Sequence, residues 1–394
     1  MPDPRPTPAD AVRDANRSAA RSFGAKPADA PCETCPNPTP ATELDGALIG
    51  AGCEPVTNPR ARGRLQPRHT YVAVHDPDPI RPRVRMERRQ IDPSVPRQGL
   101  TSAEIREAGE RATRSETECC KRKREQEGER TIVYVNGIMT TPAAHCATLA
   151  NIANLTCARV IGVYNATQSF PADLMQVARD RALVEQAAAG RNVPVGDRRN
   201  PAVDTMRDLV VESQLDPSTV GGQPLELMAH SQGGAITSLA LFQAKADLRR
   251  ESVAQPLKSV RVTSFNGAAP RWVDGPRYEH YVHLGDFVGT ETGIGKYRMQ
   301  ESRVGRDATV IAFSDSTTVP GPAFVWQEVR HDGVQARGRG VPERAASSYQ
   351  PWNASRHGVD DVGLGIYQQR SSAVGSPTCT ANSPGAAAPP STPR

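Results

Sequence analysis

Long apolar runs are missing from this chain. No stretch approaches the roughly 20 consecutive apolar residues that a membrane-spanning helix requires. The opening sequence, Met-Pro-Asp-Pro-Arg-Pro-Thr-Pro, also lacks the apolar centre of a secretory signal. These absences exclude a transmembrane helix and predict a soluble chain made in the cytoplasm. Any export is then expected to use a route that does not read such a signal.

Lysine is scarce as well. It occurs only at positions 26, 121, 123, 245, 258 and 296, and arginine supplies the rest of the 48 basic residues. These basic residues are scattered along the chain and the net charge is only +5. Nucleic-acid-binding proteins instead gather their positive charge on one face or element. The charge pattern therefore argues against nucleic acid as a partner.

Apolar residues are few for a chain of 394 residues, at 37%, whereas proline and glycine are frequent, at 35 and 32 residues. This combination predicts one compact core with irregular extensions. Residues 1–100 are rich in proline and arginine and have no sustained apolar period, apart from a β-like patch at 71–74. Residues 371–394 are rich in serine, proline and alanine. Both ends are expected to be irregular or disordered.

Residues 101–128 are predicted to form a polar helix. Thr101 and Glu104 have the spacing of a capping box, which marks a helix N-terminus. The apolar face of this segment is thin, so we expect it to bridge solvent instead of entering a core.

Residues 129–370 alternate between strands and helices. Continuous apolar runs predict buried strands, and helical spacing of apolar residues predicts the helices between them. The expected strands are 131–135, 159–164, 225–229, 260–265, 281–284 and 308–313, and the expected helices are 142–155, 173–186, 204–214 and 234–249. The alternation indicates the α/β class, with a mostly parallel sheet and helices on both faces.

Eight cysteines occur, at positions 32, 35, 53, 119, 120, 146, 157 and 379. Cys32 and Cys35 have the spacing of half a zinc site, but no second close pair with matching spacing follows. The spacing leaves a structural metal, disulfides and reduced thiols open, and favours reduced thiols. Cys146 and Cys157 flank one expected helix and are the first pair to test for a disulfide.

The most specific motif is the run Leu-Met-Ala-His-Ser-Gln-Gly-Gly at 227–234. A strand leads into a serine with small residues close by, and a long helix follows. A nucleophile elbow requires this order, because its tight turn leaves no room for side chains and forces the serine hydroxyl out above the sheet. Ala229 stands where glycine is usual. The alternative is that Ser231 only caps a helix.

This motif resembles that of the α/β-hydrolase superfamily, and within it the lipase-like branch. The resemblance covers residues 129–370. It implies a serine esterase or lipase with Ser231 as nucleophile, cleaving carboxylic esters of lipids or phospholipids through an acyl-enzyme. No metal or organic cofactor is needed for this chemistry.

In this fold an acid and a histidine follow the serine in chain order. The resemblance assigns the acid to Asp286, just past the strand at 281–284, with Asp274 and Glu291 as fallbacks. Asp286 would then hold the imidazole of the base in the correct tautomer.

The base is expected on a loop beyond the last strand. His357 lies on a polar stretch before a helix-like segment at 362–367, which is where lipase-like relatives place this histidine. His331 is the alternative, although its Asp-Gly neighbours also fit an ordinary turn.

An oxyanion hole requires two backbone amides. The first is expected from Gln232, directly after the nucleophile. The second is expected from Ile138, after the turn at Asn136 and Gly137 that ends the first core strand. The alternative for that turn is a plain Asn-Gly turn.

The organisation of the chain is similar to that of bacterial secreted lipase effectors, which combine a hydrolase with a signal-less extension. This likeness implies secretion machinery and a protective immunity protein as partners, and transient contact with a membrane surface. Residues 170–214 are long enough to form a cap over the site. Alternative functions are an inactive binding protein on a hydrolase fold and a short-chain esterase or thioesterase.

Overall fold

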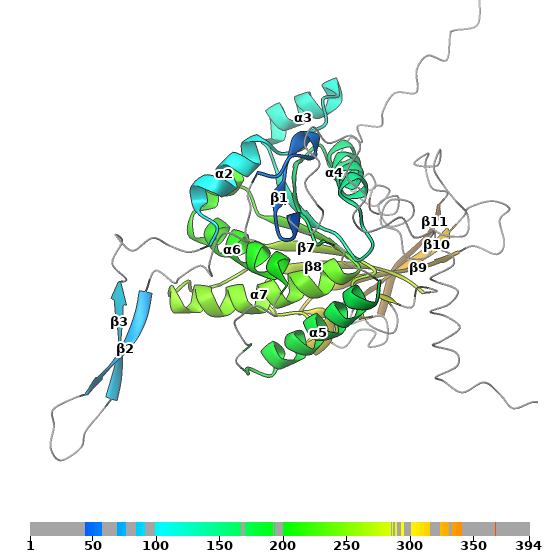
Figure 1. The fold of residues 1–394 in the computed structure, drawn as a ribbon. Helices are drawn as coiled ribbons and strands as arrows, with labels where there is room; N and C mark the ends of the chain where they lie inside the picture. The colour runs from blue at the N-terminus through cyan, green and yellow to red at the C-terminus, as the bar shows by residue number, and fades with distance from the viewer. Residues whose placement is uncertain are drawn as a thin grey trace, which may run out of the picture.

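The computed structural model shows an α/β protein built around one large sheet (Figure 1). The residues that the structure describes are 44–56, 69–75, 84–90, 99–166, 170–191, 193, 200–284, 286, 288–289, 293–294, 301–315, 324–330, 333–340 and 367.

Within these residues, nine strands form the large sheet in the order β1-β5-β4-β6-β7-β8-β9-β10-β11. Their bounds are Leu48–Ile49 (β1), Thr131–Val135 (β4), Arg159–Val163 (β5), Glu226–His230 (β6), Arg261–Phe265 (β7), Arg277–His283 (β8), Thr309–Asp315 (β9), Phe324–Arg330 (β10) and Gly333–Gly340 (β11). All pairs from β5 to β9 are parallel, whereas β1, β10 and β11 add antiparallel edges. The predicted α/β class is therefore confirmed.

All six predicted strands form, because a strand buried on both faces is a continuous apolar run. The prediction missed β1, β10 and β11, the strands that are added antiparallel at the two ends of the sheet. Strands β10 and β11 carry charged residues, and β11 also glycine, whereas β1 has only two residues, so none of the three is a long apolar run. The β-like patch at 71–74 lies within β2 (His69–His75), which pairs with β3 (Val84–Gln90) in a separate hairpin.

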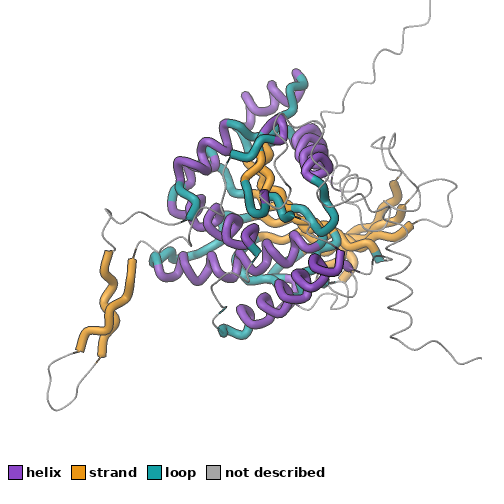
Figure 2. Tube along the Cα trace, in the orientation of Figure 1, coloured by secondary structure: helices purple, strands orange, loops and turns teal. Residues whose placement is uncertain are grey.

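Helices cover both faces of the sheet. Their bounds are Ser102–Glu110 (α2), Glu118–Glu127 (α3), Pro142–Thr156 (α4), Phe170–Ala188 (α5), Pro201–Leu215 (α6), Gln232–Arg250 (α7) and Glu301–Val304 (α8). Helices α5, α6 and α7 lie side by side on one face (Figures 1 and 2). In the described part of the chain, every helix is too short or too polar to cross a bilayer.

The strands divide their side chains between two apolar clusters. Val133 and Val135 of β4 join the cluster beneath α5, α6 and α7, whereas Ile132 and Tyr134 join the cluster beneath α4. Successive side chains of a strand point to opposite faces, so a fully apolar strand can serve two cores. This explains why the central strands read as unbroken apolar runs.

The expected polar helix over 101–128 is two helices instead. The capping box forms as predicted, since Thr101 accepts a hydrogen bond from the backbone of Glu104 and the Glu104 side chain accepts one from the backbone of Thr101. The first helix ends at Glu110 and the second begins after Thr117. Our expectation that this segment stays outside the core was wrong for α2, because Ile105 and Ala108 are fully buried in the main cluster.

Residues 170–214 do not form a separate cap in the part that the structure describes. Leu183 and Val184 of α5, and Val203 and Leu209 of α6, are buried in the main apolar cluster. Helices α5 and α6 both pack against α7. They are therefore a layer of the fold, because each turns an apolar stripe towards the sheet.

Disulfides join the N-terminal segment to α4. Cys53 pairs with Cys146, and Cys120 pairs with Cys157, which ends α4. Cys119 is also disulfide-bonded, so each cysteine that the structure describes is oxidised. The expectations of reduced thiols and of a Cys146–Cys157 pair were both wrong. Helical spacing suggested the wrong cysteine pair, because the sequence does not show which segments pack on the ends of α4.

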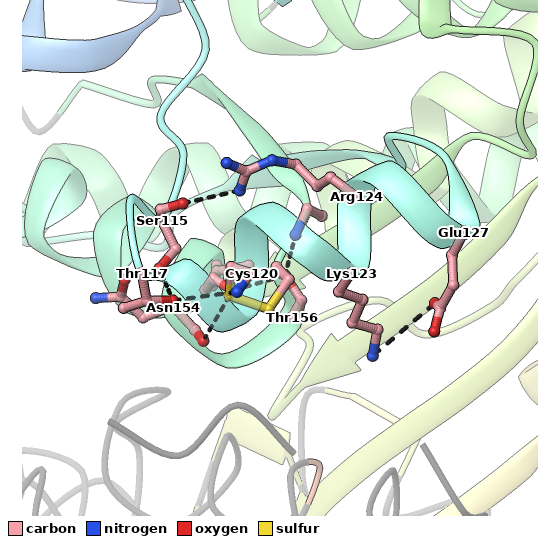
Figure 3. Close-up of a disulfide and its surroundings, with 11 residues drawn as sticks. Ser115, Thr117, Cys120, Lys123, Arg124, Glu127, Asn154 and Thr156 are labelled. Atoms are coloured by element: carbon pink, nitrogen blue, oxygen red, sulfur yellow. Dashed lines mark hydrogen bonds and ion pairs between the residues drawn. A yellow bond between two sulfur atoms is a disulfide. The ribbon is translucent and has the colours of Figure 1, made fainter. Parts of the chain in front are cut away.

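Figure 3 shows how the Cys120–Cys157 disulfide is built into α3. The hydroxyl of Thr117 accepts a hydrogen bond from the backbone N–H of Cys120 at 3.3 Å, which caps the start of α3. The Arg124 guanidinium donates to the carbonyl of Ser115 at 2.8 Å and ties the helix to the chain before it. Cys120 itself is fully buried. The disulfide is thus the inward contact of an otherwise polar helix.

Candidate functional site

Ser231 lies on a sharp turn between β6 and α7. Its backbone has φ 55° and ψ −123°, a conformation that side-chain-bearing residues rarely adopt. The strand ends at His230 and the helix begins at Gln232, so a single residue makes the connection. A nucleophile elbow has this strand–turn–helix arrangement with this strain at the serine. The alternative of a simple cap is not met, because the Ser231 side chain makes no capping hydrogen bond.

Three backbone hydrogen bonds hold the turn. The N–H of Ser231 donates to the carbonyl of Phe265 at 3.1 Å, and the Ser231 carbonyl accepts from Gly234 at 2.9 Å and Ala268 at 2.8 Å. The strain at the turn is therefore balanced by bonds to the adjacent strand β7 and the loop after it. Ser231 is only 2% exposed, so its side chain is buried, whereas the elbow motif predicts a hydroxyl that stands out above the sheet.

Two glycines allow the backbone to close around Ser231. A Cβ on Gly137 would lie 2.5 Å from the Cβ of Ser231 and 3.0 Å from its Oγ. A Cβ on Gly233 would lie 2.5 Å from the carbonyl oxygen of Val135. Neither position has room for a side chain. The turn after β4 and the start of α7 thus meet at the serine.

The site lies where the strand order of the sheet reverses. After β4 the chain adds β5 on one side and then β6 on the other side. In open α/β sheets, ligands bind at the carboxyl edge next to such a switch point, because the connections diverge there. Ser231 directly follows β6, and Gly137 comes two residues after the end of β4, at this same edge.

The residues expected to supply the oxyanion-hole amides directly follow Ser231 and Gly137 in the chain. Gln232 is the first residue of α7, and the first four N–H groups of a helix have no acceptor within it. Ile138 follows Gly137, and a Cβ on Gly137 would lie 2.5 Å from the Cβ of Ser231. The positive end of the α7 dipole also points to this place. The geometry thus brings Ser231 and Gly137 together, and Gln232 and Ile138 are the residues that follow them.

Asp286 lies at the same edge, beyond β8. It is 5% exposed and its Oδ2 accepts a hydrogen bond from the N–H of Gly289 at 2.6 Å. A Cβ on Gly289 would lie 3.1 Å from Asp286 Oδ2 and 3.0 Å from Asn266 Oδ1, so these two side chains are close neighbours. Asn266 directly follows Phe265, which binds the backbone of Ser231. Asp286 is thus two strands from the serine and linked to it through Asn266.

The fallback acids are less favourably placed. Asp274 precedes β8, and its Oδ1 accepts from the backbone of Arg306, which precedes β9. It therefore lies at the edge where the parallel strands begin, opposite to Ser231. Glu291 lies outside the described residues.

Both candidate bases, His357 and His331, also lie outside the described residues. The residues on either side of position 331–332 are nevertheless informative. Arg330 and Gly333 pair with each other, and Val329 next to them pairs with Val310 near the start of β9. Since β9 runs parallel to β6, this is the edge opposite to Ser231.

The C-terminal part of the chain returns to the sheet at Tyr367. Its ring meets that of Tyr281 edge-on, with centroids 6.2 Å apart, and packs against the cluster beneath α4. Burial raises the pKa of Tyr367 to about 12. Tyr367 is therefore anchored to the same sheet as Ser231.

The sheet also contains a serine–histidine contact, between Ser264 and His280, that is unsuited to catalysis. The Ser264 Oγ and His280 Nδ1 are 2.7 Å apart, and His280 Nε2 is 2.9 Å from the carbonyl of Val304. Both side chains are buried, and burial lowers the pKa of His280 to about 4. With both ring nitrogens engaged inside the sheet, His280 crosslinks β7, β8 and α8.

Sequence reasoning missed a set of buried amides around the elbow. Asn136, Asn165 and Asn266 each follow a central strand at its carboxyl edge, either directly or after one more residue. A buried strand that ends in asparagine at this edge is the signal that could have found them, because buried amides need partners. The carboxylate of Asp180 in α5 and the amide of Asn200 before α6 are hydrogen-bonded to this group of side chains. They carried no such signal, since each lies within or before an ordinary helix.

In the described part of the chain, no group of three His, Cys, Asp or Glu side chains could hold a metal ion. No protein-family model matches the chain, and no curated protein matches it. Interpretation of the site therefore depends on its geometry.

Proposed function

We propose that the chain is a serine hydrolase of the α/β-hydrolase type that cleaves carboxylic esters. The observation that carries this proposal is the strained backbone of Ser231, at φ 55° and ψ −123°, between a buried strand and a long helix. Strained backbone conformations of this kind cluster at active sites. Gly137 lies against this serine, and Ile138 follows Gly137. In the proposed site the strained turn therefore brings the hydroxyl of Ser231 beside the backbone amides of Gln232 and Ile138.

The proposed reaction is an acyl transfer in two halves. The Ser231 oxygen bonds to the ester carbonyl carbon while its proton passes to the base histidine. The amides of Gln232 and Ile138 stabilise the negative oxygen of the tetrahedral intermediate. The alcohol then leaves with the proton from the histidine. A water molecule repeats the sequence on the acyl-serine and releases the carboxylic acid.

The base is His357 in this proposal. The ends of β10 and β11 that flank His331 lie at the edge opposite to the serine, which speaks against His331. The resemblance to lipase-like hydrolases favours the later histidine, His357. Asp286 is the acid that orients it, since it is buried at the serine edge and already held by the Gly289 amide.

An apolar acyl group is the substrate that the surroundings favour. Met139 follows Ile138, and Leu174 and Met175 lie on α5; these three are exposed by 36, 40 and 67%. Thr140, next to Met139, accepts a hydrogen bond from the Tyr164 hydroxyl, and Asp173, next to Leu174, acts electrostatically on the same hydroxyl. In the proposed site, Met139, Leu174 and Met175 therefore form an apolar rim beside the turn that follows β4. Such a rim suits lipid or phospholipid esters and brief contact with a membrane surface.

The disulfides favour a place of action outside a reducing cytoplasm. Each cysteine that the structure describes is oxidised. Disulfides form and persist in oxidising compartments and are rare in the cytosol. This supports the proposal that the chain is exported, as a secreted antibacterial effector with an immunity protein as partner would be. Toxicity that requires both oxidising conditions and Ser231 supports that role, and harmless expression in an oxidising compartment contradicts it.

A fluorophosphonate probe tests the central proposal. The probe phosphonylates an activated serine, so we expect the full chain to be labelled and the Ser231→Ala variant to remain unlabelled. Ser264→Ala is the matched control, because Ser264 also contacts a histidine but lies inside the sheet. Labelling should persist in that control. If neither the wild type nor the control takes the label, the chain is a binding protein and not a hydrolase.

A series of p-nitrophenyl esters with increasing acyl length tests the substrate class. The apolar rim predicts that kcat/KM rises with chain length. A maximum at acetate or butyrate would remove the lipase assignment and leave a short-chain esterase or thioesterase.

A further inference from the structure

We infer that Asp180 is a positioning residue that holds the oxyanion hole of the proposed hydrolase through the side chain of Gln232. The inference rests on the proposed function of Ser231. It concerns a closed ring of buried side chains from four separate elements. These are Asn165 after β5, Asp180 in α5, Asn200 before α6 and Gln232 at the start of α7.

Each bond of the ring is explicit. The Gln232 amide donates from Nε2 to Asp180 Oδ2 at 2.9 Å, and the Asn165 amide donates from Nδ2 to Gln232 Oε1 at 2.9 Å. Asn200 closes the ring, since its Nδ2 is 3.0 Å from Asn165 Oδ1 and 3.4 Å from Asp180 Oδ2. Asp180 is the one ring member with a carboxylate, and it accepts from two amides.

A side branch connects the ring to the turn after β4. The Nδ2 of Asn136 donates to the carbonyl of Asn165 at 2.8 Å and to the carbonyl of Gly137 at 2.9 Å. In return the N–H of Asn165 donates to Asn136 Oδ1 at 2.9 Å. Ile138 follows Gly137 directly. One network therefore reaches both residues whose backbone amides form the proposed oxyanion hole.

Asp180 determines which way the network points. A carboxylate only accepts hydrogen bonds, so it directs the Nε2 of Gln232 towards α5 and leaves Gln232 Oε1 for Asn165. This fixes the side chain of the residue whose backbone amide faces the reacting carbonyl. The bond from Gln232 is charge-assisted, which makes it stronger than a bond between neutral groups. Asp180 does not touch the substrate in this scheme.

The protonation of Asp180 makes the arrangement sensitive to pH. Burial raises the pKa of Asp180 to about 6, and the hydrogen bonds from Gln232 and Asn200 oppose that rise. The charged groups that act on it are Arg179, next to it on α5, and Asp45 from the N-terminal segment. Asp45 itself binds the N–H of Ala166, beside the ring member Asn165. Above pH 6 the carboxylate is charged and the bond from Gln232 is strongest.

The test compares Asp180→Asn with the wild type, using the fluorophosphonate labelling rate and the hydrolysis of a p-nitrophenyl ester. Misplacing a group at a reacting centre costs up to roughly 100-fold in rate. We expect kcat and the labelling rate to fall by about tenfold to 100-fold at pH 8, with KM changed by less than about twofold. The ratio of wild-type to variant rate should shrink as the pH falls below 6. The catalytic histidine is common to both proteins, so its titration cancels in this ratio.

Gln232→Met provides a second, independent variant. It keeps the backbone amide at position 232 but removes the side chain that Asp180 binds. We expect the same loss of rate, and we expect the double variant to be no slower than the slower single variant, because both act through one contact. Multiplied losses in the double variant, or an unchanged rate in Gln232→Met, would overturn the inference. Should Asp180→Asn not fold, the rate of Gln232→Met alone decides.

Glu212→Gln is the matched control for burying an altered carboxylate. Glu212 is also buried, but it accepts from the hydroxyl of Ser102 at 2.6 Å and holds α2, away from the ring. We expect it to lower the thermal midpoint without changing the labelling rate. If the wild type takes no label, the proposed function fails and this inference fails with it. If the wild type is labelled and Asp180→Asn is labelled equally fast, only the inference fails.

Discussion

The edge of the sheet around Ser231 and helix α3 are held by different physical means. Around Ser231, buried amides are paired and backbones approach so closely that glycine is required at Gly137 and Gly233. In α3, only Cys120 is buried, and ion pairs such as Lys121 with Glu118 lie on the surface. Covalent bonds replace the missing apolar contact there. Close backbone packing and buried hydrogen bonds thus hold the site, whereas a disulfide holds a helix that buries little apolar surface.

The largest expected effect comes from removing the crosslinks. The Cys53–Cys146 and Cys120–Cys157 pairs span 93 and 37 residues of sequence. Closing loops of that size stabilises a fold by about 4 kcal/mol each in the chain-entropy model. We therefore expect the variant with serine at Cys53, Cys120, Cys146 and Cys157 to be much less stable in urea.

A reducing agent provides the control for that variant. It should lower the urea midpoint of the wild type strongly and that of the four-serine variant only weakly. A wild type that unfolds at the same urea concentration with and without reductant would show that the disulfides do not hold the N-terminal segment.

Gly137→Ala tests the geometry of the elbow. The added Cβ would lie 2.5 Å from Ser231 Cβ, so one of the two backbones has to move. We expect the fluorophosphonate labelling rate to fall at least about 100-fold, since small displacements at a reacting centre have effects of this size.

Gly190→Ala is the matched control for that substitution, because nothing lies within 4 Å of the added carbon. It carries the strain of a left-handed backbone, about 1 kcal/mol, and should leave labelling unchanged. Equal labelling of the wild type and Gly137→Ala would mean that this glycine is not needed by the nucleophile.

The pH dependence of stability should reflect two buried histidines. Burial lowers the pKa of His145 to about 3 and that of His280 to about 4. Between about pH 4 and the usual value of 6.5, the unfolded chain binds these protons and the folded chain does not. The free energy of unfolding therefore falls as the pH falls below 6.5.

His145→Leu isolates one of the two contributions. His145 stacks on Tyr134, and neither of its ring nitrogens has a hydrogen-bond partner among the residues that the structure describes. Each histidine adds up to about 1.4 kcal/mol per pH unit to the slope, and the variant should lose one such share. Urea titrations at pH 5 and pH 7 measure this change. An unchanged slope would show that His145 takes up a proton in the folded chain.

The smallest expected effect belongs to the surface of α3. Lys121 is 3.1 Å from Glu118, and both side chains are exposed. Exposed ion pairs stabilise proteins by roughly 0 to 1 kcal/mol. Lys121→Gln should therefore change the urea midpoint by less than the removal of either disulfide, by a wide margin. A loss comparable to that of a disulfide would end the distinction between the two regions.

Much of the parallel sheet was predictable because burial on both faces leaves a local trace. The six core strands and the elbow each occupy a short run of residues whose composition follows from their own surroundings. The antiparallel strands β10 and β11 were not predictable from such runs. Nor were the disulfide partners, because Cys53 and Cys146 are joined only by the way distant segments pack.

The amino-acid sequence by itself determined the α/β class, the strand order along the chain and the position of a strained serine, since these depend on neighbours within about ten residues. Only the tertiary structure decided that Asp180 and Gln232 share a hydrogen bond and that Asp286 lies at the edge of the sheet where Ser231 lies. Contacts of this kind join residues about 50 positions apart. A side chain shows no sign of such a partner until the chain between them has folded.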